Sequence, residues 1–315
     1  MNPNASAPHY VAFAGGVGGA KLVHGLAQIL PPTALTVIVN TGDDFEHFGL
    51  TICPDLDTVC YTLAGLANPE TGWGRRDETW QALENVRRLG GPDWFRLGDR
   101  DLGTHLERTR RLRNGESLTQ ITQDFCRAWG IEHRILPMSD DAVRTVVHTE
   151  EYGDLPFQEY FVKYACKPRV RGFRFEGAAT ARPVPQALEA LAQAQALILC
   201  PSNPWVSIDP ILSIYARHIP SGLPVIAVSP IIGGQAVKGP AAKMFAELGI
   251  SPSALAVAEY YRSLLTHFVI DQVDAPLQEA IAAMGIRVLV TQTLMRTETD
   301  RRRLAEDVLN FLREP

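Results

Sequence analysis

The chain has 315 residues, of which 46% are hydrophobic and 21% are charged, and its formal net charge is -5. A chain of this size and composition can bury a large hydrophobic core, which excludes a disordered or fibrous protein. Acidic and basic residues nearly balance, so nothing predicts a general attraction to nucleic acids or to acidic membrane surfaces, and we expect small-molecule partners.

The cysteines and the apolar runs indicate the cellular compartment of the protein. Five cysteines are scattered along the chain without a C-x-x-C pair, which is typical of reduced thiols. The first ten residues lack a basic segment followed by an apolar one, and no window approaches eighteen uninterrupted apolar residues. We therefore expect a cytoplasmic protein without a membrane partner.

Short apolar or β-branched runs, bounded by Gly, Pro or Asn, predict the strands of a core sheet. They cover residues 10–14, 35–39, 196–200, 224–228, 266–270 and 286–290. Helical patterns lie between many of them, such as the apolar face of Val23, Leu26 and Leu30. The alternation predicts an α/β fold with a Rossmann-like, doubly wound, mainly parallel sheet, whose ligands bind beyond the carboxyl ends of the strands.

The middle of the chain follows a different pattern. Residues 68–134 contain helix-like segments without clear strands, which predicts a small helical insertion between two parts of the α/β core, residues 1–67 and 135–315. Residues 143–175 alternate more like strands, and we expect an antiparallel extension or an arm over the site.

The stretch AFAGGVGGAKL, residues 12–22, follows the first predicted strand and nearly matches two phosphate-binding signatures. The dinucleotide fingerprint G-x-G-x-x-G needs a third glycine where Lys21 stands. The Walker A pattern needs a glycine at Ala20 and a Ser or Thr at Leu22. Neither nicotinamide nor ordinary ATP chemistry can be assigned from this stretch.

The same glycine loop can still bind an anion. Gly15, Gly16 and Gly18 allow backbone N–H groups to approach an anion closely at a helix N-terminus, and Lys21 adds a positive charge. The alternative is a tight strand-to-helix turn that binds nothing.

Acidic residues crowd together after the second predicted strand. Residues 39–59 contain Asp43, Asp44, Glu46, Asp55 and Asp57. Clustered carboxylates repel one another or gather around a cation, and oxygen ligands in a phosphate-handling fold favour magnesium or manganese. The alternative is that Asp55 or Asp57 caps the next helix while the others face water. Because the second strand ends beside the glycine loop, we expect at least two of these acids to bind a ligand or metal.

Three further loops carry polar side chains that suit a site. Asp99, Arg100 and Asp101 form a glycine-flanked turn whose guanidinium could bind phosphate or carboxylate, or could form a surface ion pair. Ser202 and Asn203 follow a buried strand, where they could contact a base or ribose or simply form a turn. A similar loop places Lys238 just before a helix. No H-x-x-H, H-E-x-x-H or G-x-S-x-G motif is present, which disfavours a histidine-ligated metal and a serine hydrolase.

Taken together, FAGGVGGAKL, VNTGDD, GLTICPDLDTVCYTLAG, RLGDRD, ILPMSDD, CPSNP, VSPIIGG and VAEYY resemble the 2-phospho-L-lactate transferase family of coenzyme F(420) biosynthesis, from about residue 10 to 300. The resemblance implies transfer of a phospholactyl-type group from a guanosine diphosphate adduct to the deazaflavin Fo, with release of GMP and formation of F(420)-0 or an analogue. The transferred group would be 2-phospho-L-lactate or a group derived from phosphoenolpyruvate or 3-phosphoglycerate. The resemblance also implies Mg2+ dependence and a homodimer.

The resemblance carries roles onto particular residues. Asp57, Arg100 and Asp43 are the implied catalytic residues, with Asp57 or Asp43 as the base. Asp43 and Asp57 are the leading magnesium ligands, followed by Asp44 and Asp55. The implied substrate contacts are Gly15, Gly16, Gly18 and Lys21 on the diphosphate, Ser202 and Asn203 on the guanosine, and Asn40, Thr41, Asp55, Asp57, Asp99 and Arg100 elsewhere.

The three-carbon group of the donor remains open, because Val17, Gly19 and Ala20 stand where the archaeal members commonly have threonines and a proline. Two other readings of the function also remain open. A related family with similar glycine and PDLDTV-like motifs consists of regulatory nucleotide-sugar-binding proteins. A nicotinamide-dependent oxidoreductase is a third interpretation, weakened by the broken fingerprint.

Overall fold

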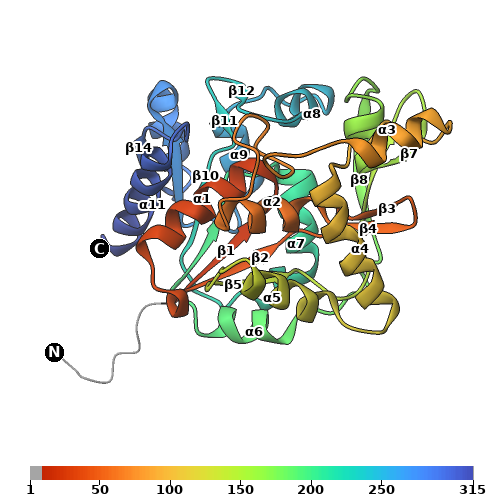
Figure 1. Cartoon of the computed structure of the whole chain (residues 1–315). Helices are drawn as coiled ribbons and strands as arrows, with labels where there is room; N and C mark the ends of the chain where they lie inside the picture. The colour runs from red at the N-terminus through yellow and green to blue at the C-terminus, as the bar shows by residue number, and fades with distance from the viewer. Residues whose placement is uncertain (1–8, 315) are drawn as a thin grey trace.

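The computed structural model describes residues 9–314 and has a seven-stranded parallel sheet at its centre (Figure 1). The strand order is β14-β13-β10-β9-β1-β2-β5. The bounds are β1 Tyr10–Ala14, β2 Leu35–Val39, β5 Arg134–Pro137, β9 Ala196–Leu199, β10 Val225–Val228, β13 His267–Asp271 and β14 Arg287–Thr291. From β1 the chain builds outward through β2 to β5, then returns to β9 on the other side of β1. This reversal is the topological switch of a doubly wound sheet, so the predicted fold class is confirmed.

Helices cover both faces of the sheet. One face packs against α1 Gly16–Ile29, α2 Pro54–Leu63, α5 Leu118–Ala128 and α11 Glu298–Arg313. The other packs against α6 Pro185–Ala192, α7 Asp209–Tyr215, α8 Ala241–Glu247, α9 Ala254–Tyr260 and α10 Gln278–Ala282. Along β1 the side chains alternate between the two layers, since Ala12 belongs to the first cluster and Phe13 to the second. Strands covered on both faces are apolar throughout, which explains why their runs are recognisable in the sequence.

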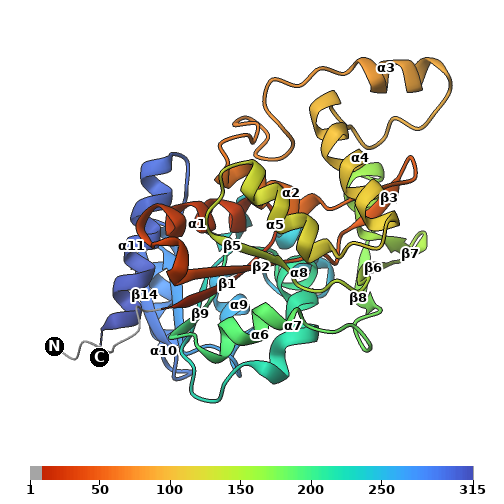
Figure 2. The same cartoon turned by 60° about the horizontal axis from the view of Figure 1, so that its bottom comes forward.

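The helical segment predicted over residues 68–134 contains α3 Gln81–Arg88, α4 Asp99–Arg113 and α5. Helix α3 has no buried residue and stands away from the sheet on a long excursion of the chain (Figure 2). Helix α5 is different because Leu118 and Cys126 belong to the core cluster on one face of the sheet. The division into two core parts and an insertion stays a prediction.

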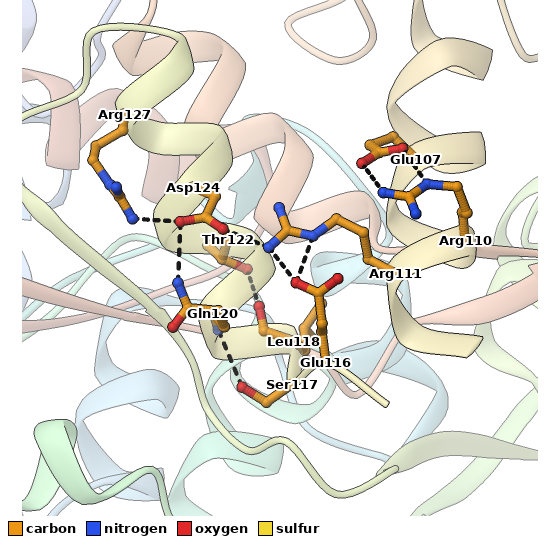
Figure 3. Close-up of polar contacts among 10 residues, drawn as sticks. All are labelled: Glu107, Arg110, Arg111, Glu116, Ser117, Leu118, Gln120, Thr122, Asp124 and Arg127. Carbon is orange, nitrogen blue, oxygen red and sulfur yellow. Dashed lines mark hydrogen bonds and ion pairs between the residues drawn. The ribbon is translucent and has the colours of Figure 1, made fainter. Parts of the chain in front are cut away.

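Polar contacts join the end of α4 to the start of α5 (Figure 3). The Arg111 guanidinium donates to Glu116 Oε2 at 2.8 Å through Nε and also contacts Asp124. Ser117 is the N-cap of α5, and its Oγ accepts the Gln120 N–H at 3.1 Å. These contacts fix the direction in which α5 leaves the α4 turn and returns to the sheet.

The smaller sheets lie outside the core. The antiparallel extension expected over residues 143–175 is confirmed as β6 Arg144–Thr149, β7 Gly153–Pro156 and β8 Val170–Glu176, in the order β7-β6-β8. Two hairpins were not predicted: β3 Phe45–His47 with β4 Leu50–Ile52, and β11 Ile231–Ile232 with β12 Gln235–Ala236. Within residues 9–314, no helix combines the length and hydrophobicity that crossing a bilayer requires. All five cysteines are free thiols.

Candidate active site

The glycine loop lies at the switch point, where the ends of β1 and β9 are neighbours. The Gly15 N–H donates to Ser202 Oγ at 3.2 Å, and the Ser202 hydroxyl donates to the Gly15 carbonyl at 2.7 Å. A side chain at Gly18 would collide with the carbonyl oxygen of Pro201. Close packing against the β9 loop therefore accounts for part of the glycine content, and the phosphate cradle stays a prediction.

The side chain of Asp55 lies at the N-terminus of α1. Its Oδ1 accepts the Gly16 N–H at 2.7 Å, so the first free amide of α1 is already bonded to a carboxylate. Asp55 lies in the first turn of α2, whose N-cap is Cys53. Asp55 therefore caps a helix, as the alternative interpretation expected, but the helix is α1 and not α2.

The Asn40 side chain brings two of the predicted acids together. Its Nδ2 donates to Asp55 Oδ2 at 2.9 Å and lies 3.3 Å from Asp43 Oδ1, while its Oδ1 accepts the Gly42 N–H at 2.8 Å. Gln158 donates to Asp43 Oδ2 at 3.0 Å. Asp43 and Asp55 are therefore neighbours in a buried site, as the position of both segments beside the first strand predicts.

Burial disfavours the ionised forms of these carboxylates and raises their pKa values. Burial, with the nearby charges of Asp55 and Asp44, raises the pKa of Asp43 well above its usual range. Burial raises the pKa of Asp55 to about 6, against the hydrogen bonds from Asn40 and Gly16. It raises the pKa of Asp44 to about 7, against the charge of Arg144. A bound cation would relieve the repulsion and favour the ionised forms.

The donor set fits a magnesium ion only in part. Asp44 Oδ1 is buried and has no hydrogen-bond partner among the described residues. In residues 9–314, however, no three His, Cys, Asp or Glu side chains are grouped as a metal site. Asp43 and Asp55 could hold Mg2+ if water and substrate phosphates completed its shell, which is a common arrangement for this ion.

Asp57 lies in a separate ion pair, which sequence patterns did not predict. Arg108 Nη1 donates to Asp57 Oδ2 at 3.1 Å, and Nη2 contacts Oδ1. The two residues are only 6% and 3% exposed. The network continues from Arg108 through His105, whose Nδ1 is 3.2 Å from Arg108 Nη1, to Asp101. This arrangement orients the Asp57 carboxylate and joins α2 to α4.

Local pattern carries no signal for Arg108. It is one of several arginines in the turns of α4, and the others lie at the surface or at the junction with α5. Only the docking of α4 on α2 determines which of them turns inward. Its spacing from Asp57, 51 positions along the chain, also lies outside any motif.

Residues 99–101 of the GDRD segment form the first turn of helix α4 rather than a separate turn, and their predicted contact with the substrate stays a prediction. Asp99 caps the first turn of α3, where it accepts the Gln81 and Ala82 N–H groups at 3.0 Å. The Arg100 guanidinium is exposed and lies 3.9 Å from Asp77 and 3.5 Å from the Arg76 carbonyl. Asp43, Asp44, Asp55 and Asp57 are not among its partners, and Asp57 is instead paired with Arg108.

A narrow pocket of about 80 Å3 opens beside the glycine loop. Its walls include Val17, Gly18, Lys21, Asn203 and Lys238. Lys21 Nζ donates to the Met295 carbonyl at 2.8 Å, and Asn203 Oδ1 accepts the Trp205 N–H at 3.1 Å. Predicted diphosphate and guanosine contacts thus share one pocket.

The remaining predicted residue of the second loop is Thr41. It is buried, and its Oγ1 has no hydrogen-bond partner within the described part of the chain.

Sequence comparison decides the family. Residues 10–313 match the family model described as 2-phospho-L-lactate transferase CofD. The chain belongs to the CofD family. It is 45% identical over 298 residues to a phosphoenolpyruvate transferase of Streptomyces griseus, covering 92% of this chain and 93% of the relative. It is 42% identical over 310 residues to a 2-phospho-L-lactate transferase of Methanopyrus kandleri, covering 96% of this chain and 97% of the relative.

Membership of the CofD family makes the protein a transferase of phospho-groups in coenzyme F(420) biosynthesis. A solved structure supports the fold of this CofD protein. The UPF0052 protein of Bacillus halodurans superposes with a TM-score of 0.62 at 13% identity, covering 97% of this chain and all of the other. The identity is low, so the likeness concerns the fold alone.

Proposed function

We propose that the protein transfers a phospholactyl-type group from a guanosine diphosphate adduct to a ribityl hydroxyl of Fo, releasing GMP and forming F(420)-0 or an analogue. The observation that carries the proposal is the meeting of Asp43 and Asp55 with the glycine loop at the switch point, in a CofD chain. The names of the relatives support a three-carbon phosphorylated donor. They do not agree on 2-phospho-L-lactate or phosphoenolpyruvate, and 3-phosphoglycerate also remains open.

The proposed reaction is an in-line displacement at phosphorus. The Fo hydroxyl oxygen bonds to the phosphorus that carries the three-carbon group, the bridging P–O bond breaks, and GMP leaves with the bonding electron pair. The hydroxyl proton passes to a carboxylate. Asp43 suits this role better than Asp57, because both carboxylate oxygens of Asp57 are already paired with Arg108.

We propose that Mg2+ is held by Asp43 and Asp55, which Asn40 brings together, rather than by Asp43 and Asp57. When bound, the ion would neutralise phosphate charge. The chain's own residues do the rest: Gln158 and Asn40 orient Asp43, and Gly16 orients Asp55. Lys21 supplies positive charge at the pocket wall. A homodimer in the cytoplasm completes the proposal.

Matched variants test this function. With Fo, the guanosine diphosphate adduct and Mg2+ supplied, we expect Asp43→Asn to lower the rate of GMP release by about a hundredfold or more. Asp154→Asn also removes a carboxylate, but one that pairs with Arg174 at the surface, so its rate should stay close to that of the unmodified protein. Equal rates for all three proteins would refute the proposal. Tight binding of a nucleotide sugar without any product would favour the regulatory protein instead.

A further inference from the structure

Lys238 lies in the loop between β12 and α8, beside the pocket at the glycine loop. Its Nζ donates to the main-chain carbonyl of Thr71 at 2.5 Å. Among residues 9–314, no acidic side chain forms an ion pair with it. A lysine at a pocket wall is therefore held by a single neutral acceptor, which it can exchange for a charged one at little cost.

The segment that contains Thr71 lies against the glycine loop. Gly72 has a φ of +76°, and a Cβ there would lie 2.7 Å from Val17 Cγ1 and 3.3 Å from Lys238 Nζ. The position therefore requires glycine. Residues 71–72 thus contact both the phosphate-loop residue Val17 and the lysine, and they narrow the space between them.

The pocket in this conformation is too small for the donor. It holds about 80 Å3, whereas pockets for ligands of nucleotide size hold roughly 300–1,000 Å3. Part of the wall must move before a guanosine diphosphate adduct can enter. The contact between Thr71 and Lys238 is the one that a phosphate could replace.

Positive charge at the pocket has no matching acid at its walls. Lys21 and Lys238 both line it. Burial lowers the pKa of Lys21, and the charges of Arg301 and Lys238 lower it further, while Asp300 acts in the opposite direction. Each lysine donates to a main-chain carbonyl, but Lys21 is half-buried and Lys238 is exposed, so Lys238 is the cation that can move more easily.

We propose that Lys238 binds a phosphate of the nucleotide donor by exchanging the Thr71 carbonyl for a phosphate oxygen, and that residues 71–76 move away from the glycine loop as it does so. The inference rests on the proposed function, since it takes this pocket as the donor site. No covalent bond changes. Nucleotide binding and the opening of the 71–76 segment are then one coupled event.

Affinity for GDP tests the contact. In isothermal titration we expect Lys238→Ala to weaken GDP binding by about ten- to a hundredfold, and Lys238→Arg to recover most of the loss. Lys243→Ala is the matched control, because Lys243 lies outside the pocket walls and pairs with Glu247. GDP binding by Lys238→Ala at the affinity of the unmodified protein would overturn the inference.

Trypsin tests the movement. Arg75 and Arg76 are the last two residues of the segment, and Arg76 is exposed. GDP should accelerate cleavage at these two residues in the unmodified protein, whereas Lys238→Ala should be cleaved fast with or without GDP. A cleavage rate that GDP does not accelerate would overturn the exchange while leaving the donor pocket in place. Failure of the unmodified protein to bind GDP would overturn the proposed function as well.

Discussion

At the scale of single residues, the ion pair of Asp57 with Arg108 fixes the position of one predicted site carboxylate. Both side chains are buried, so neither charge has water to replace its partner. Removing one member of such a pair costs about 3–5 kcal/mol, while removing both costs much less. The pair therefore couples the stability of α4 to the orientation of a predicted catalytic carboxylate.

This coupling can be measured by urea unfolding. We expect Arg108→Met to lower the free energy of unfolding by about 3–5 kcal/mol, because it leaves the Asp57 carboxylate buried and unpaired. The double variant Asp57→Asn with Arg108→Met should be more stable than the sum of the two single changes. Strict additivity would show that the two side chains do not interact as the structure has them.

Asp209, a partly buried acid at the start of α7, predicts a pH dependence of stability. Burial raises the pKa of Asp209 to about 7, against the hydrogen bond that it accepts from Tyr260. An aspartate in an unfolded chain titrates near 4, so between about pH 4 and pH 7 the folded protein holds the extra proton. Asp209 therefore favours folding at low pH, and this contribution is lost as the pH rises through 7.

The substitution Asp209→Asn removes that titration. The free energy of unfolding of the variant, minus that of the unmodified protein, should be higher at pH 8 than at pH 5 by on the order of 2 kcal/mol. Asp141→Asn is the control, since the amide and guanidinium of Arg182 lower the pKa of Asp141 and place its titration below this interval. If this difference in the free energy of unfolding for Asp209→Asn did not change with pH, the raised pKa of Asp209 in the folded protein would be wrong. Denaturant midpoints at the two pH values provide the measurement.

At the scale of elements, helices α1 and α11 pack closely at Gly25. A Cβ at this position would collide with the carbonyl oxygen of Arg301, a main-chain atom that cannot turn aside. Gly103, within α4, has no positive φ, and a Cβ there would meet nothing within 4 Å. The two glycines thus differ in the space around them.

Thermal unfolding separates these two sites. We expect Gly25→Ala to cost about 1–3 kcal/mol through overpacking. Gly103→Ala should gain about 0.5–1 kcal/mol, since alanine is the better helix former. If both changes stabilised the protein equally, the close approach of α1 to α11 would be wrong.

The elements that sequence patterns predict are those buried on both faces. The predicted and observed bounds agree for β1 and β2, and the predicted starts of β10, β13 and β14 are one residue early. Strand β5 escaped notice because it begins at the exposed Arg134 and ends at Pro137, which breaks the apolar run. The β3–β4 hairpin lies inside the acidic stretch, where the polar residues indicate a loop.

At the scale of the whole molecule, the parallel sheet explains why part of the site could be predicted. Parallel strands end at one edge, so the glycine loop and the acids after β2 must lie close together, and Asp55 does contact Gly16. Contacts between distant segments have no local signature. The Asp57–Arg108 pair and the approach of Thr71 to Lys238, 167 positions away, depend on how separate elements dock.

Mass spectrometry of the product formed from Fo tests the central claim most directly. The protein is given Fo, Mg2+ and equal amounts of the guanosine diphosphate adducts of 2-phospho-L-lactate, phosphoenolpyruvate and 3-phosphoglycerate. We predict that Fo gains the mass of one phosphorylated three-carbon group, with one GMP released for each Fo consumed, and the mass identifies the donor. Unchanged Fo with intact adducts, or GMP released without any addition to Fo, would contradict the proposed transfer.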